Sequence, residues 1–156
     1  MHGPSDQGPW WASVTVWVVV NAVCLLQAAG FISRVTTGGR QTNHALGYLI
    51  VALAVPAAVA LAAFVRARAD WLQLIGPAVF LVFVTLMISV DYIAPIEFRS
   101  PPRYEVLVPY LVLFFGSIVL MGLPMYRLNR SLWLVTVVSA TLLIISMVVA
   151  MRKGVG

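Results

Sequence analysis

The chain has 156 residues, of which 62% are hydrophobic and 10% charged, and its mean hydropathy is +0.98. Soluble domains have about half apolar and about a quarter charged residues, so this composition excludes a water-soluble domain and predicts an integral membrane protein. The net charge is +5, but the basic residues lie in short gaps between apolar runs, which favours membrane lipids as partners and excludes nucleic acid.

Five apolar runs follow along the chain, at about residues 10–32, 45–65, 71–90, 106–126 and 132–151. Each has roughly 20 residues, or ~30 Å as a helix, which matches the hydrocarbon thickness of a bilayer. Backbone polar groups in hydrocarbon must be satisfied within their own segment, so each run is predicted to be helical. The sequence therefore predicts an all-α fold, with residues 1–156 forming a single bundle of five transmembrane helices with short loops.

Three of these segments carry a face of small or weakly polar residues. The faces are Ser13, Trp17, Asn21, Cys24 and Ala28 in the first, Ala54, Ala58 and Ala62 in the second, and Thr136, Ser139, Ala140, Ser146 and Ala150 in the fifth. Such faces let helix backbones approach closely and exchange hydrogen bonds. We expect them to pack within the bundle; the alternative is that one of them faces another copy or another subunit.

Local signals mark where the helices begin and bend. Thr42 or Asn43 is expected to cap the start of the second helix. The four prolines within or near the spans predict kinks, because proline removes a backbone donor. They are Pro56, Pro77, Pro109 and Pro124.

Asn21 and Gln27 are the clearest uncharged polar residues of the membrane interior. Amides in such positions usually form hydrogen bonds across helices. We expect this role for both residues, and the alternative is that they line a cavity.

The segment "DYIAPIEFRSPPRYE", residues 91–105, holds three of the five acidic residues of the chain. Its charged residues are Asp91, Glu97, Arg99, Arg103 and Glu105. A rise of ~1.5 Å per residue from Trp71 places Asp91 at the opposite membrane surface. The prolines that follow disfavour helix, so we interpret the segment as a stiff interfacial lid, with a ligand or ion contact as the alternative.

Signals for cofactors, metals and catalysis are missing from the sequence. The only histidines are His2 and His44, and the only cysteine is Cys24, so a haem or zinc site lacks ligands. No G-x-S-x-G or H-E-x-x-H motif occurs. We expect no cofactor and no metal, and we rank an enzyme below a non-catalytic protein.

Orientation follows from the distribution of basic residues. Five spans place Arg34, Arg40, Arg99, Arg103, Arg152 and Lys153 on one side, and Arg66, Arg68, Arg127 and Arg130 on the other. The positive-inside rule then predicts an external N-terminus and a cytoplasmic C-terminus, in a prokaryotic plasma membrane.

The favoured function is a non-catalytic one, either as a helix-packing subunit or oligomer or as a holder of a lipid-like ligand. The alternative is a small transporter or channel gated by Asp91 and the charged loop 97–105. An intramembrane enzyme ranks third.

Overall fold

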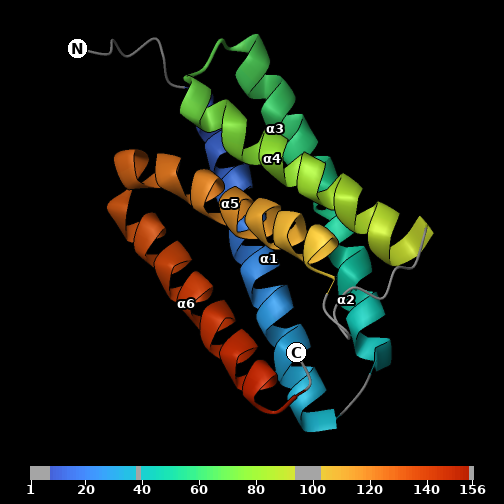
Figure 1. Cartoon of the computed structure of the whole chain (residues 1–156). Helices are drawn as coiled ribbons and strands as arrows, with labels where there is room; N and C mark the ends of the chain where they lie inside the picture. Colours follow the sequence, from blue (N-terminus) through green and yellow to red (C-terminus); the bar gives the residue numbers. More distant parts are fainter. Residues whose placement is uncertain (1–7, 38–39, 94–102, 155–156) are drawn as a thin grey trace.

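The computed structural model describes residues 8–37, 40–93 and 103–154. Its helices are α1 (Trp10–Thr37), α2 (Arg40–Ala52), α3 (Ala54–Arg66), α4 (Trp71–Ile88), the π-helical turn η2 (Ser89–Ile93), α5 (Tyr104–Leu128) and α6 (Arg130–Arg152) (Figure 1). No strand occurs in these ranges. The all-α prediction is therefore confirmed.

Five segments are long and apolar enough to cross a membrane: Trp10–Thr36, Ala45–Arg66, Trp71–Ile93, Tyr104–Leu128 and Arg130–Arg152. Each contains one of the predicted spans and extends beyond it at one or both ends, because the helix continues past the apolar run. The cap expected at Thr42 or Asn43 is wrong, since α2 already begins at Arg40.

The second span is interrupted close to its proline. It consists of α2 and α3, and a turn at Leu53 separates them. Pro56 has no N–H to donate to the carbonyl of Ala52, so the regular helical ladder is interrupted there. Pro77, Pro109 and Pro124 lie inside α4 and α5 without ending either helix.

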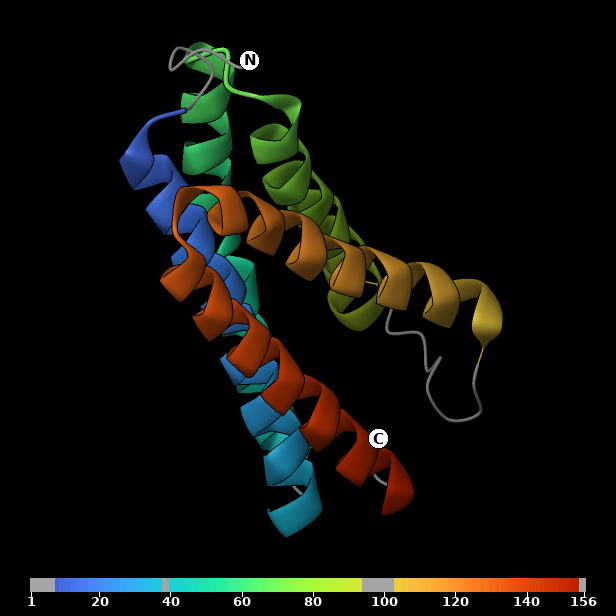
Figure 2. The same ribbon diagram turned by 90° about the vertical axis from the view of Figure 1, so that its left-hand side faces the viewer.

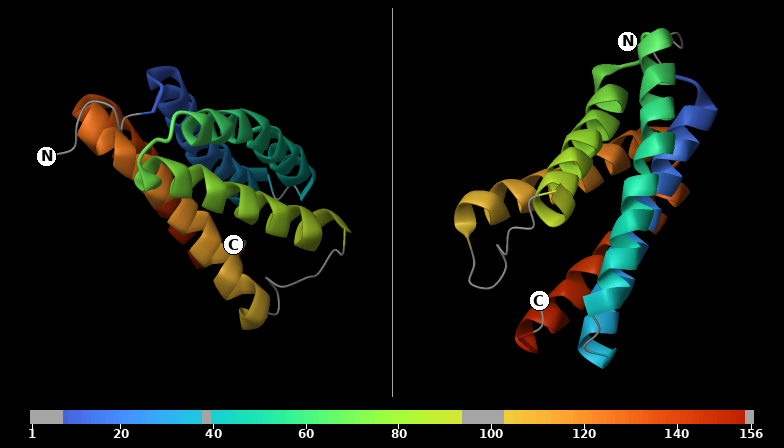
Figure 3. Two further views of the ribbon diagram at one scale, coloured as in Figure 1. Left: turned by 90° about the horizontal axis from the view of Figure 1, so that it is seen from above. Right: turned by 90° about the vertical axis from the view of Figure 1, so that its right-hand side faces the viewer.

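The helices form two arms that share one end: α1 and α6 make up the first arm, and α4 and α5 make up the second. α1 has its most extensive contacts with α6, and α4 with α5. In Figure 2, α1 and α6 run downward together, whereas α4 and α5 run toward the right. The two further views agree, and the arms meet where the α3–α4 and α5–α6 turns lie (Figure 3).

A single residue, Asn129, makes the turn between α5 and α6. Its N–H donates to the carbonyl of Met125 (2.7 Å), and its backbone is extended (φ −157°, ψ 106°). Its side-chain oxygen accepts hydrogen bonds from the N–H groups of Ser131 (3.0 Å) and Leu132 (3.3 Å), which caps α6. One residue therefore ends α5 and starts α6, and the two helices leave it in different directions.

The backbones of α4 and α5 approach closely at Gly76. A Cβ atom at this position would lie 2.8 Å from the backbone carbon and oxygen of Leu120 and from the nitrogen of Met121. Pro124 cannot donate an N–H to the carbonyl of Leu120, so this oxygen is available to the Cα–H of Gly76. Only glycine allows this approach.

We expect Gly76→Ala to lower the free energy of unfolding by about 1–3 kcal/mol, because the added methyl group overlaps rigid backbone. Gly116→Ala is the matched control in α5, since a Cβ there has nothing within 4 Å. It should leave stability unchanged or raise it by up to ~1 kcal/mol through helix propensity. Unfolding by SDS titration in mixed micelles measures both, and equal stabilities would contradict the close approach.

Candidate functional site

The centre of the α1–α6 interface is a hydrogen-bonded group around Asn21, which is only 8% exposed. Its amide nitrogen donates to the hydroxyl of Thr136 (3.1 Å) and to the carbonyl of Trp17 (2.7 Å). Its amide oxygen accepts from the hydroxyl of Ser139 (2.7 Å). One turn away, the indole of Trp17 donates to the carbonyl of Leu132 (2.8 Å). The polar faces of the first and fifth spans therefore meet, and Asn21 acts as an interhelical contact.

The alanine row of the second span does not pack as expected. Ala58 and Ala62 are exposed, and the buried face of α3 is made by Ala57, Ala60 and Phe64. The expectation that the row packs within this bundle is wrong for Ala58 and Ala62. Their small side chains lie on the outer surface of α3 instead.

Asp91 lies in a helix and not in a loop. The helix continues through η2 to Ile93, and α5 begins at Tyr104, so the connection is shorter than the predicted segment 91–105. The carboxylate of Asp91 is half-buried and accepts a long hydrogen bond (3.5 Å) from the hydroxyl of Tyr110. Glu97 and Arg99 lie outside the described residues, so the structure does not test their part of the lid.

The last two charged residues of the segment face outward. Arg103 and Glu105 are exposed at the start of α5. Glu105 lies in the first turn of α5, where a negative charge is favourable near the helix N-terminus.

Aromatic residues surround the π-helical turn. Tyr92 contacts Tyr48 of α2 (ring centroids 5.0 Å apart), and Tyr110 contacts Phe83 (5.2 Å). These contacts join the end of α4 to α2 and α5. Asp91 therefore lies on the second arm, whereas Asn21 and the half-buried Gln27 lie on α1, and the structure does not bring the three residues together.

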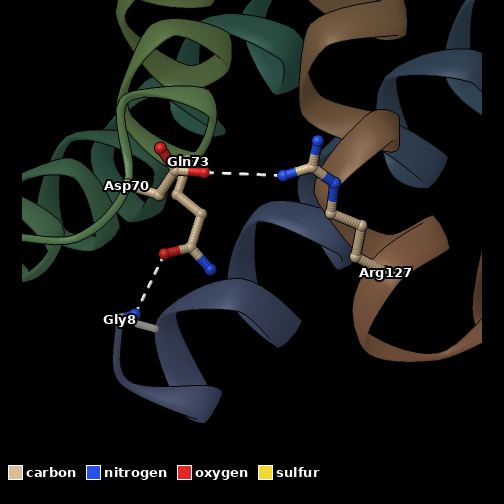
Figure 4. Close-up of polar contacts among 4 residues, drawn as sticks. All are labelled: Gly8, Asp70, Gln73 and Arg127. Atoms are coloured by element: carbon tan, nitrogen blue, oxygen red, sulfur yellow. Dashed lines mark hydrogen bonds and ion pairs between the residues drawn. The ribbon is translucent and has the colours of Figure 1, made fainter. Parts of the chain in front are cut away.

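A cluster of polar residues that the sequence did not indicate as a site lies at the shared end of the arms (Figure 4). Asp70, before α4, forms an ion pair with Arg127 near the end of α5 (3.6 Å). Gln73 accepts a hydrogen bond from the N–H of Gly8 (3.0 Å). The ion pair is largely exposed and contributes roughly 0–1 kcal/mol, so it positions the helix ends more than it stabilises them.

A small cavity lies close to this cluster of polar residues. Its volume is about 10 Å³, and Ser13, Gln73 and Pro77 are among its lining residues. The buried hydroxyl of Ser13 has no hydrogen-bond partner within the described part of the chain. This volume is about that of one water molecule, so the cavity is too small for an organic ligand.

A much larger groove of about 490 Å³ runs between α1 and α6. Its lining is Leu25, Ala28, Ala29, Ile32 and Val35 from α1, and Leu142, Ile145, Ser146 and Val149 from α6. Ser146 supplies its only side-chain hydroxyl, and this hydroxyl donates to the carbonyl of Leu143 (2.8 Å). The groove is therefore apolar in chemistry, and we call it the α1–α6 groove.

Neither cavity is lined by Asn21, Gln27 or Asp91. Over residues 8–37, 40–93 and 103–154, no group of three His, Cys, Asp or Glu side chains could hold a metal ion.

Comparisons with protein-family models, curated proteins and solved structures give no match. Of the two cavities, the α1–α6 groove is the larger.

We expect the hydrogen bond between Asn21 and Ser139 to give a coupling energy of about 0.5–1.7 kcal/mol in a double-mutant cycle. The variants are Asn21→Ala, Ser139→Ala and their combination, with unfolding measured in mixed micelles. Thr141→Ala is the control, because the exposed Thr141 hydroxyl bonds only within its own helix. Additive effects of the two substitutions would contradict an interhelical contact.

Asp91→Asn should leave proton flux into proteoliposomes at the background level of the wild type. The reason is that Asp91 lies on the second arm, whereas Asn21 and Gln27 lie on α1, and that Asn21 is engaged in hydrogen bonds between α1 and α6. A pH-sensitive dye inside the vesicles measures the flux. A flux in the wild type that Asp91→Asn abolishes would support the transporter alternative instead.

Proposed function

We propose that this chain is a small, non-catalytic protein of a prokaryotic plasma membrane that holds the hydrocarbon chain of a lipid-like ligand in the α1–α6 groove. The observation that carries the proposal is the groove itself, which has about 490 Å³ of space and an apolar lining. It is roughly three times the size of the ~150 Å³ apolar cavity that accepts benzene.

The size and chemistry of the groove suit an acyl chain. Leu25, Ile32 and Leu142 are among the branched side chains that offer apolar contact, and Ala28 and Ala29 leave the space between them. In a bilayer the surrounding lipid is as apolar as the groove, so retention depends on van der Waals packing rather than on the hydrophobic effect. A chain that fits the groove is held longer than one in the bulk bilayer.

The polar interior residues support a role in packing. Asn21, Thr136 and Ser139 satisfy one another between α1 and α6. Side chains engaged in this way hold the two helices in register next to the groove, and they have no free donor arranged for chemistry. This favours a binding protein over an enzyme.

The proposal keeps the membrane orientation that the distribution of basic residues predicts, with the N-terminus outside and the C-terminus in the cytoplasm. The end of α1 with Arg34 and the end of α6 with Arg152 and Lys153 would then lie in the cytoplasmic headgroup layer. The α1–α6 groove would open to the inner leaflet.

A second candidate function is that of a subunit or homo-oligomer. It is favoured by Ala58 and Ala62, which are exposed on α3 at the spacing that lets helices of two chains approach closely. Another copy or another membrane protein could pack on this surface.

One pair of variants tests both candidates. Ala29→Leu fills the α1–α6 groove, and Ala58→Leu adds the same side chain to the outer surface of α3. Each protein is purified in mild detergent, and native mass spectrometry measures both retained lipid and the number of chains.

We expect Ala29→Leu to lose most of the retained lipid and Ala58→Leu to keep it. A change in the number of chains in Ala58→Leu alone would support the second candidate. Equal lipid retention by the wild type and Ala29→Leu would overturn the groove as the ligand site.

A further inference from the structure

The apolar stripe that α6 contributes to the groove leads directly to two cations. The lining residues Ile145 and Ser146 follow Leu142 by three and four positions, and Val149 follows them by four and three. The same steps from Val149 reach Arg152 and Lys153. Residues at this spacing share one side of a helix. Arg152 and Lys153 are exposed, and neither forms an ion pair with a described residue.

A third cation lies at the same end of the groove, on α1. Arg34 is next to the lining residue Val35, and its guanidinium stands 5.4 Å from the centre of the Phe31 ring. A cation–π contact of this kind helps to position the guanidinium near the helix end. The ends of α1 and α6 lie together at the free end of the first arm (Figure 2).

The described acidic residues lie elsewhere. Asp70 is at the shared end of the arms, where it contacts Arg127. Asp91 and Glu105 belong to η2 and α5 on the second arm. Among the described residues, this end of the groove therefore carries cations and no acidic side chain, while the groove itself is lined by apolar residues.

We propose that the α1–α6 groove selects an anionic phospholipid, with an acyl chain between α1 and α6 and the headgroup phosphate at Arg152 and Lys153. This inference rests on the proposed function, because it takes the groove as the site of a lipid chain. The planar guanidinium of arginine can donate two parallel hydrogen bonds to phosphate oxygens, and the ammonium group of lysine supplies a compact positive charge. A zwitterionic lipid carries the same phosphate together with its own ammonium group, so the cations favour the lipid with net negative charge.

The experiment uses the full chain in nanodiscs of equal parts phosphatidylglycerol and phosphatidylcholine. The protein is transferred to mild detergent, and native mass spectrometry identifies the retained lipid. Each cation near an anionic headgroup gives roughly a fivefold preference, so the two cations should make the wild type retain phosphatidylglycerol roughly 25-fold over phosphatidylcholine.

The double variant Arg152→Gln/Lys153→Gln should lose this preference and still retain one lipid of either kind. Arg66→Gln/Arg68→Gln is the matched control, because it removes two exposed cations from the opposite end of the bundle. It should keep the preference of the wild type. All four substituted side chains are exposed, and the thermal midpoint of each variant checks that it folds.

The outcomes separate the two proposals. Retention of both lipids in equal amounts by the wild type would overturn the anionic selectivity and leave the groove as a lipid site. An equal loss of preference in the control variant would overturn it too, since any pair of cations would then serve. No retained lipid in the wild type, with no effect of Ala29→Leu, would overturn both proposals.

Discussion

The arrangement of this protein depends on the hydrogen bonds that Asn21 makes between α1 and α6. Within hydrocarbon there is little hydrophobic driving force between helices, so close packing and interhelical hydrogen bonds decide which helices pair. Asn21 bonds to both Thr136 and Ser139, and the Trp17 indole reaches the carbonyl of Leu132 in the same interface. These contacts set the register of α1 against α6. Toward their other ends, small residues such as Ala28 and Ala29 leave the groove open.

The second arm is held together in a different way, and a single residue connects it to α6 of the first arm. Asn129 alone connects α5 to α6, and the close approach of Gly76 to Leu120 holds α4 against α5. Asp70 and Arg127 link the same two helices near the shared end. The arms diverge away from the Asn129 turn (Figure 2), and the α1–α6 groove remains separate from Asp91 and its aromatic surroundings.

The sequence predicted the five spans well, because a bilayer requires about 20 apolar residues and a helix for each crossing. It also identified the polar faces around Asn21 and Ser139, since small and weakly polar residues are typical of helix contacts. It could not say that these two faces meet, because pairing depends on the whole arrangement of the chain. The alanine row was misjudged because alanine is equally stable facing lipid or another helix.

Other features left no sequence signal. The volume of the α1–α6 groove depends on the separation of two helices that are far apart in the chain. Asp70 and Arg127 are also distant in the sequence, and either one alone resembles an ordinary interfacial charge. The charge pattern of residues 91–105 attracted attention to Asp91, but the helix extends through Asp91, and its hydroxyl partner Tyr110 comes from α5.

The pairing of α1 with α6 can be measured directly by distances between spin labels in lipid nanodiscs. Cysteines replace Thr36, Met151 and Glu105, which are exposed at the free ends of α1, α6 and α5, in a Cys24→Ala background. Our account predicts a short, narrow distance distribution between positions 36 and 151, and a clearly longer distance between 105 and 151. Similar distances for both pairs, or a broad distribution between 36 and 151, would contradict the pairing of α1 with α6 on which the groove depends.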